Sequence, residues 1–319
     1  MTNVQSFIHG LYPRSAQLVA TSRDFERKRV GQSALSSQQK KDSAVLLSLQ
    51  KKYNFNFLEI GKVTWHDIFR PIVEASTGVK TGALTRWFDN NCFYRQPIIT
   101  GKLSVNFTRL RASIPTISPN KKWKVTLPSP YTFAKLSEDT STKDFKKTLE
   151  NVTQLLVKIT EDLAKRGVEV IQFNEPAAVY YQASKNDLLL LKHVLEKIAK
   201  KKKTAKIAVN FYFGDAKEAV KTLVNAKGID IVGVDFYKTN LESLPKKVPF
   251  DIIAGVIDGR NSLLEDEKAV EKFLKEAVNH LSPENLFIAN NSDLELLPEP
   301  VAQEKLKIIH RLQVLLKSS

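Results

Sequence analysis

Three short polar clusters carry the side chains that could do chemistry in this sequence. Glu175 stands in an Asn-Glu-Pro-Ala segment directly after an apolar run, and Asp235 ends a second run. Asp258, Arg260 and Asn261 follow a third run, in Asp-Gly-Arg-Asn. Carboxylates held together in a pocket act as general acids or bases, or contact a ligand amine. Each also has a structural interpretation, because Glu175 suits a buried turn and Asp258 could pair with Arg260 to brace a loop.

The apolar runs before these clusters have the length and composition of strands buried on both faces. Eight such runs lie at 7–12, 57–61, 123–127, 168–173, 206–212, 229–236, 250–257 and 285–289. Amphipathic helical patterns separate the later ones, at 145–166, 216–225, 265–281 and 300–316. Strands that alternate with helices are typical of a parallel sheet. We therefore predict one α/β domain over residues 1–319, folded as a (β/α)8 TIM barrel.

The region from about 62 to 122 is too long for one helical crossover and is rich in aromatic residues. We interpret it as an insertion after the second strand that shapes the mouth of the barrel. Ligands bind barrels of this kind at the carboxyl ends of the strands. The three polar clusters stand at such ends.

The net charge of +15 is the most unusual bulk property of the chain. Its clearest lysine run, at 200–203, follows a helical pattern, where cations suit the helix dipole. The other lysines are scattered rather than gathered in one stripe, which makes nucleic-acid binding unlikely. No apolar run approaches the length of a membrane span, and no secretory signal is visible. With one cysteine, Cys92, these features predict a cytoplasmic protein without a disulfide framework or a multi-cysteine zinc site.

The segment from Thr85 to Tyr94, TRWFDNNCFY, resembles a motif of cobalamin-independent methionine synthase, in the amino-terminal of its two barrels. Further segments are similar to that family in the same order: SPYTF at 129–133, RGVEVIQFNEPA at 166–177, GVIDGRN at 255–261 and LFIANNS at 286–292. The resemblance runs from about Gly10 to about Leu312. It implies a role in methionine biosynthesis, in methyl transfer from a folate-type donor to homocysteine.

The resemblance also implies how the work is divided. The family's catalytic barrel binds zinc through a His-x-Cys pair, a Glu and a second Cys, whereas the matching strand ends here offer NFYF at 210–213, DFY at 235–237 and NNSD at 290–293. We therefore expect no zinc on this chain and a separate zinc-bearing catalytic barrel as its partner. Arg86 matches a basic residue that contacts the polyglutamate tail of the donor. Arg14 lies near the family's second tail contact, although the residues after it depart from the pattern.

Three functions stay open at this point. The first is a stand-alone counterpart of the amino-terminal barrel, and the second is an independent zinc-free enzyme of the same superfamily that acts on an anionic small molecule. Nucleic-acid binding ranks last. The sequence assigns no catalytic residue. The candidate substrate- or donor-binding residues are Arg14, Arg86, Glu175, Asp235, Asp258, Arg260 and Asn261.

Overall fold

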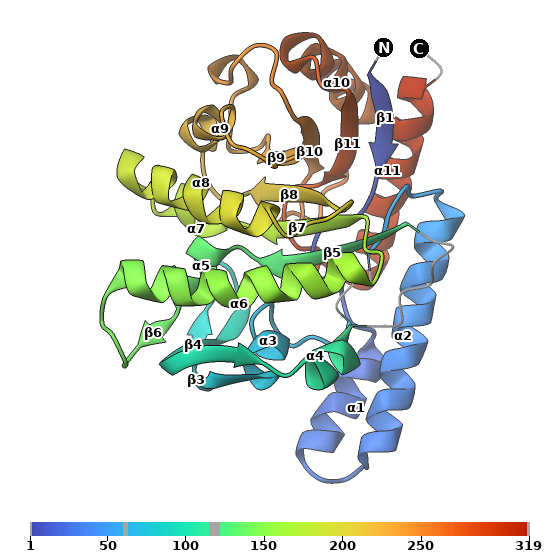
Figure 1. Cartoon of the computed structure of the whole chain (residues 1–319). Coiled ribbons are helices and arrows are strands. Elements are labelled where there is room, and N and C mark those ends of the chain that lie inside the picture. Colours follow the sequence, from blue (N-terminus) through green and yellow to red (C-terminus); the bar gives the residue numbers. More distant parts are fainter. Residues whose placement is uncertain (1, 60–62, 115–121, 318–319) are drawn as a thin grey trace.

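The computed structural model describes residues 2–59, 63–114 and 122–317 and is built around a curled sheet of eight parallel strands (Figure 1). The strands are β1 (Asn3–Ser6), β2 (Leu58–Glu59), β5 (Trp123–Pro128), β7 (Val170–Asn174), β8 (Lys206–Phe211), β9 (Ile231–Asp235), β10 (Asp251–Ile257) and β11 (Asn285–Asn290). Their order is β1-β11-β10-β9-β8-β7-β5-β2. The two outer strands, β1 and β2, approach each other. A hydrogen bond of 2.9 Å joins the amide of Asn56, just before β2, to the carbonyl of Ser6 in β1. The predicted α/β class is confirmed, with the strand order of a TIM-like barrel.

Helices join successive strands and cover the outside of the sheet (Figure 1). They are α5 (Pro130–Leu136), α6 (Phe145–Lys165), α7 (Pro176–Tyr180), α8 (Lys185–Ala199), α9 (Lys217–Leu223), α10 (Glu267–Leu281) and α11 (Glu299–Lys317), with a 3-10 turn at Leu241–Ser243. Helix α6 shows why these segments are helical. The Asp144 carboxylate caps its first turn, one face of the helix is buried, and Gly167 ends it with φ +83°.

The first strand is the clearest error of the sequence prediction. The run at 7–12 was expected to be the strand, but β1 lies just before it, at Asn3–Ser6. Phe7 and Ile8 are buried although they stand outside the ladder. An apolar run reports burial, and burial alone does not distinguish a strand from a packed loop. The second predicted strand, 57–61, contains β2, and its residues 60 and 61 lie outside the described residues.

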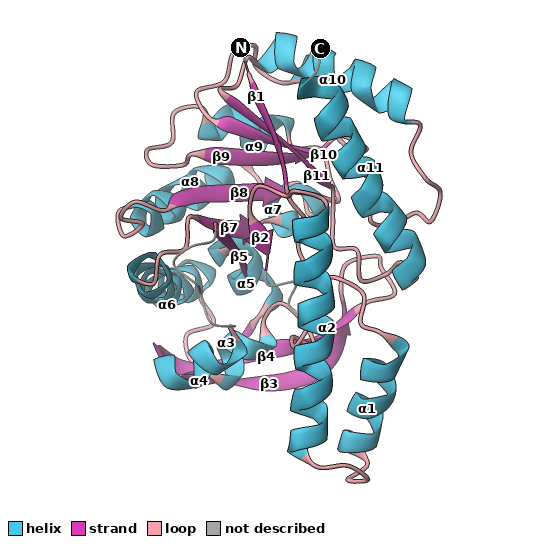
Figure 2. Ribbon diagram, turned by 90° about the vertical axis from the view of Figure 1, so that its right-hand side faces the viewer, coloured by secondary structure: helices cyan, strands magenta, loops and turns pink. Residues whose placement is uncertain are grey.

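The segment between β2 and β5 contains elements that the sequence did not predict. Helix α3 (Arg70–Glu74) leads into the antiparallel strands β3 (Ser76–Arg86) and β4 (Phe93–Val105), and α4 (Phe107–Ser113) follows. A short strand, β6 (Glu138–Asp139), pairs with β4 to complete a three-stranded sheet. Figure 2 shows this hairpin beside α3 and α4, below the barrel. Residues 62 and 115–121 of the predicted insertion lie outside the described residues.

Two further helices were also not predicted. Helix α1 (Ala16–Glu26) follows β1, and α2 (Gln32–Lys52) returns the chain to β2. Together they form a helical arm, Ala16–Lys52, whose lower end projects from the body of the molecule in Figures 1 and 2. The Ser15 hydroxyl caps α1 and also donates to the carboxylate of Asp42 on α2 at 3.0 Å.

The interior of the curled sheet contains a cluster of aromatic rings and, next to this cluster, a buried ion pair. Phe7, Phe57 and Phe287 pack together there, with ring centroids 5.2–6.3 Å apart. Lys124 of β5 and Glu59 of β2 are fully buried and form an ion pair at 2.5 Å. A larger apolar cluster fills the space between the sheet and its helices.

Candidate functional site

The carboxyl ends of the strands carry a buried polar network. His9 follows β1, and Gln172 and Asn174 belong to β7. Asn210 lies in β8, and Tyr212 follows that strand. All five side chains are buried. Nδ1 of His9 lies 2.6 Å from Nε2 of Gln172, which donates to Oδ1 of Asn174 at 2.9 Å. Burial raises the pKa of Tyr212 well above its usual value. Most of the polar atoms here are therefore occupied by one another.

Sequence analysis missed His9 because it lies within the run taken for the first strand. A strand residue at that place would belong to the core of the barrel. The available signal was a histidine within an apolar run, directly before Gly10. That signal is weak, since a lone histidine in such a run is usually a packed core residue.

The turn of the β3–β4 hairpin packs against the loops that follow β7 and β8. This turn, residues 87–92, is called the hairpin tip below. The Phe88 ring contacts Tyr180, Tyr181 and Phe213, with centroids 4.9, 5.7 and 5.6 Å away. Beneath the tip, a space of only about 10 Å³ remains between Trp87 and the loop after β11. Such a space has room for about one water molecule. The hairpin tip and the loop after β11 are therefore closely packed at this point.

Polar contacts hold the hairpin tip to the barrel. The Arg260 guanidinium donates to the Asp89 carboxylate at 3.1 Å and lies over the ring of Phe213, 5.2 Å from its centroid. Phe88 and Phe213 both adopt left-handed backbone, with φ 53° and 74°. Such a conformation costs on the order of 1–3 kcal/mol per residue and persists where the surroundings fix it. The ring contact and the ion pair supply that constraint.

Arg86 braces the tip from the other side. Its Nε donates to the carbonyl of Asn90 at 2.7 Å, and its Nη2 donates to Oδ1 of Asn91 at 3.0 Å. The side chain is exposed, but two of its donor nitrogens are already used. The structure therefore gives Arg86 a local role besides the predicted contact with a ligand.

Asp235 and Asp258, two of the predicted residues, both contact Asn291. Its Nδ2 donates to Asp235 at 3.0 Å and to Asp258 at 3.2 Å. Burial, the largest effect, raises the pKa of Asp235. The expected side-chain pair of Asp258 and Arg260 is replaced: the backbone amide of Arg260 donates to Asp258 at 3.0 Å, while its guanidinium reaches the hairpin tip. Asn261 is exposed and accepts from the amide of Leu263 at 3.0 Å.

Glu175 is fully buried and links two loops. Its carboxylate accepts from the Thr132 hydroxyl at 2.6 Å, and from the amides of Thr132 and Ala178 at 3.2 and 3.0 Å. Burial raises the pKa of Glu175, and these hydrogen bonds oppose that rise. The carboxylate caps α7 and ties it to α5, which supports the structural interpretation of this residue.

A cavity of about 430 Å³, the rim pocket, opens near the hairpin tip. It lies between the loops after β1 and β11, and Arg14, Trp65 and Glu295 are among its lining residues. The Arg14 side chain is exposed. Its positive charge lowers the pKa of Glu295, but burial and the charge of Asp293 outweigh it and raise that pKa to about 7. The rim pocket thus combines an available cation with a carboxyl group that titrates near neutral pH.

Cys92 has a partner that the sequence did not reveal. Its Sγ lies 3.1 Å from Oε1 of Glu295. Burial and the Glu295 carboxylate raise the pKa of the Cys92 thiol. The thiol therefore stays protonated, and it joins the hairpin tip to the wall of the rim pocket.

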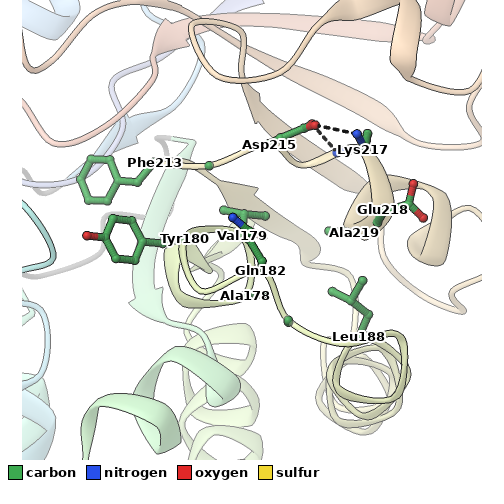
Figure 3. A pocket seen from close by; sticks show the side chains of 12 residues that line it. Ala178, Val179, Tyr180, Gln182, Leu188, Phe213, Asp215, Lys217, Glu218 and Ala219 are labelled. Atoms are coloured by element: carbon green, nitrogen blue, oxygen red, sulfur yellow. Dashed lines mark hydrogen bonds and ion pairs between the residues drawn. The ribbon is translucent and has the colours of Figure 1, made fainter.

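A groove of about 510 Å³ lies outside the barrel, between α7, α8 and the loop after β8 (Figure 3). Figure 3 shows Tyr180 and Phe213 at one end and the paired side chains of Asp215 and Lys217 at the other. That ion pair measures 3.3 Å. Its charges compensate each other, so the groove offers no unpaired charge of its own from these two residues.

The strand ends do not present the donor set of the family's zinc site. Within the described ranges, no group of three or more His, Cys, Asp or Glu side chains converges on a point where a metal ion could bind. The ends of β8, β9 and β11 carry Asn210, Asp235 and Asn290, which supply amide and carboxylate oxygens rather than thiolates.

Every helix in the described part of the chain is too short or too polar to span a bilayer.

A family model described as "Cobalamin-independent synthase, N-terminal domain" matches residues 25–282 of the chain. This match covers well over half of the sequence. The chain belongs to this family. The resemblance that the motifs at 85–94, 166–177 and 255–261 predicted is therefore confirmed.

Two kinds of relatives differ in length. A "Methionine synthase" of Sulfolobus acidocaldarius is 24% identical over 96% of this chain and 90% of its own length. The "5-methyltetrahydropteroyltriglutamate--homocysteine methyltransferase" of Bacillus velezensis is 28% identical over 74% of this chain, but over only 32% of its own length. The chain thus spans about a third of such bacterial relatives.

Solved structures confirm the fold. A putative vitamin-B12-independent methionine synthase of Listeria monocytogenes superposes with a TM-score of 0.78 over 98% of both chains, at 17% identity. A B12-independent methionine synthase of Shewanella superposes with a TM-score of 0.73 over 91% of both chains, at 18% identity. At these identities the likeness establishes the architecture alone.

Proposed function

We propose that this chain is a stand-alone counterpart of the amino-terminal barrel of cobalamin-independent methionine synthase. It supports methyl transfer from a folate-type donor to homocysteine, together with a separate catalytic barrel that carries the zinc. The names of the relatives support the class of reaction. The match to the family model of the N-terminal domain supports the assignment to the amino-terminal barrel. In this account the sheet is a closed (β/α)8 barrel, and the segment 62–122 is an insertion that shapes its mouth.

We infer that the hairpin tip fills the mouth of the barrel, and its packing carries this proposal. Phe88 and Trp87 occupy the place where a barrel enzyme holds its substrate, and about 10 Å³ remains beneath them. Glu175, Asp235 and Asp258 are each engaged by neighbouring amides. An independent zinc-free enzyme that used these three carboxylates would need them to line an accessible pocket. None of the three lines the rim pocket or the groove between α7 and α8. The arrangement favours a supporting role over that alternative.

The rim pocket is the place we propose for the anionic tail of the donor. Arg14 is exposed at its edge, whereas the guanidinium of Arg86 is held by the hairpin tip. A polyglutamate tail carries several carboxylates, which an arginine binds through charge-assisted hydrogen bonds. Arg14 is therefore the primary contact and Arg86 the secondary one, an inversion of the order that the sequence motif implied.

Replacing Arg14 with glutamine tests the tail contact. With the catalytic barrel present, we expect the KM for 5-methyltetrahydropteroyltriglutamate to rise about tenfold at unchanged kcat, because one charge-assisted contact contributes about 1.5 kcal/mol or more to binding. The KM for the monoglutamate form should change little, since that donor lacks the extended tail. Steady-state kinetics with the two donors measure both values.

Lys200→Gln is the matched control, because it removes an exposed positive charge from the end of α8 without touching the rim pocket. It should leave both KM values as they are. Equal KM values of the Arg14→Gln variant and the wild type for the triglutamate donor would contradict the proposed tail contact.

A further inference from the structure

The helical arm, Ala16–Lys52, buries unusually little of its surface. Helix α2 has 21 residues, of which three are buried, whereas α6, also of 21 residues, buries eleven. Leu18 is the only buried residue of α1. Figures 1 and 2 both show the lower end of the arm free of the rest of the molecule. Packing against the barrel therefore does not account for most of the arm.

Contacts within the arm do not account for it either. A helix that is polar on most sides is stable when many ion pairs link successive turns, or when it bridges two domains. Among the described residues, the arm has one ion pair, between Arg29 and Asp24 at 3.5 Å, and it joins exposed side chains. Such a pair contributes between about 0 and 1 kcal/mol. The apolar contacts of the arm are limited to Leu18, Leu35 and Leu46 in the core cluster and a few partly buried neighbours. A contact with another protein would account for the exposed remainder.

The charge of the arm indicates the chemistry of what it contacts. The range 16–52 contains eight Lys and Arg residues against three Asp and Glu residues. One of the acids, Asp42, is already occupied by Ser15 and Gln38. Arg23, Arg27 and the adjacent Lys40 and Lys41 are exposed. A partner face that complements this surface has to carry carboxylates.

Exposed apolar side chains lie on the same side of the molecule as the root of the arm. The arm begins directly after β1, at the carboxyl-end face of the sheet. Leu84 and Phe93 lie in the hairpin strands next to its tip, Tyr181 follows α7, and Leu263 and Leu264 follow β10. These five side chains are 48–73% exposed. Exposed apolar groups ringed by charge are typical of protein interfaces, whereas a nucleic-acid site would be polar throughout.

We propose that the helical arm is the docking element that holds the separate catalytic barrel against the mouth face, through an acidic surface on that barrel. This inference rests on the proposed function, because it names the partner of the same site. The arm extends beyond the filled mouth and contacts the partner on one side. The exposed apolar side chains contact the partner on the other side. In the longer relatives the matching segment is part of one longer polypeptide. In this proposal, ionic contacts of the arm hold the two separate chains together.

Charge reversal on the arm tests this proposal. We expect Arg23→Glu/Arg27→Glu and Lys40→Glu/Lys41→Glu each to weaken the complex with the zinc-bearing catalytic barrel by about tenfold or more, and high salt to weaken the wild-type complex as well. Lys200→Glu/Lys201→Glu is the matched control, since it reverses two adjacent exposed lysines at the amino-terminal end of the barrel. Isothermal titration gives the Kd values, and circular dichroism verifies that each variant keeps its helix content.

The outcomes separate the two proposals. Loss of affinity in both arm variants, with the control unchanged, supports the arm as the docking element. A wild-type complex that forms but is insensitive to arm reversal overturns the arm alone and leaves the proposed function standing. Absence of any complex overturns the proposed function and the arm together. Tight binding of duplex DNA or RNA through the same residues would also overturn the docking proposal.

Discussion

The substitution Lys124→Met is expected to lower the free energy of unfolding by about 3–5 kcal/mol. Nζ of Lys124 lies 2.5 Å from Oε2 of Glu59 and 2.8 Å from the Thr126 hydroxyl, and all three side chains are buried. The ammonium group also lies 5.0 Å from the centroid of the Phe7 ring, inside the barrel. Methionine fills a similar volume but leaves the Glu59 carboxylate without its cation. An uncompensated buried charge is among the costliest defects in a core.

Lys197→Met provides the matched control. Lys197 also pairs with a carboxylate, that of Glu150 at 2.8 Å, but both side chains are more than a third exposed. Water compensates the remaining charge there, so this variant should lose at most about 1 kcal/mol. Urea unfolding measures both values. If the two variants lost the same free energy, the interior pair would not have the role described here.

Trp87→Ala is expected to cost about 3–5 kcal/mol, because truncating a buried tryptophan leaves a large cavity. The Trp87 ring is 6% exposed and packs against Phe69, Phe88 and Tyr94, with centroids 5.8, 4.8 and 5.6 Å away. Its removal also takes away the support beneath the hairpin tip. We therefore expect the loss of stability to be accompanied by faster hydrogen exchange of the amides at 87–92.

Phe93→Ala tests the same hairpin from its other face. Phe93 is 50% exposed, and its truncation should change the free energy of unfolding by no more than about 0.5 kcal/mol. Denaturant unfolding of the two variants is the direct comparison. Equal losses would show that the aromatic segment 85–94 packs differently from the arrangement described above.

The sequence predicted those parts of the fold that depend on local pattern. The strands of the second half and the helices α6, α10 and α11 were found within a few residues of their positions, because their apolar periodicity continues over many residues. The family followed from five short segments in a fixed order. Glu175 was correctly considered as a turn residue, since a carboxylate before Pro-Ala suits the start of a helix.

Features that depend on contacts between distant segments could not be predicted in this way. Arg260 pairs with Asp89, and Cys92 contacts Glu295; both contacts join the early hairpin to the last part of the barrel. Lys124 lies in an apolar run of the sequence. Its pairing with Glu59 depends on how β5 is aligned with β2, and the sequence of one strand does not determine that alignment. The arm was missed because its helices lack the strong apolar stripe that pattern analysis requires.

We propose that this chain supports methyl transfer performed by another polypeptide. The most direct test is the initial rate of methionine formation from homocysteine and 5-methyltetrahydropteroyltriglutamate by the separate zinc-bearing barrel, with and without this chain. We expect an equimolar amount of the chain to raise this rate on the order of tenfold, by positioning the donor, while the chain alone forms no methionine. An unchanged rate, or methionine formed by the chain alone, would contradict it.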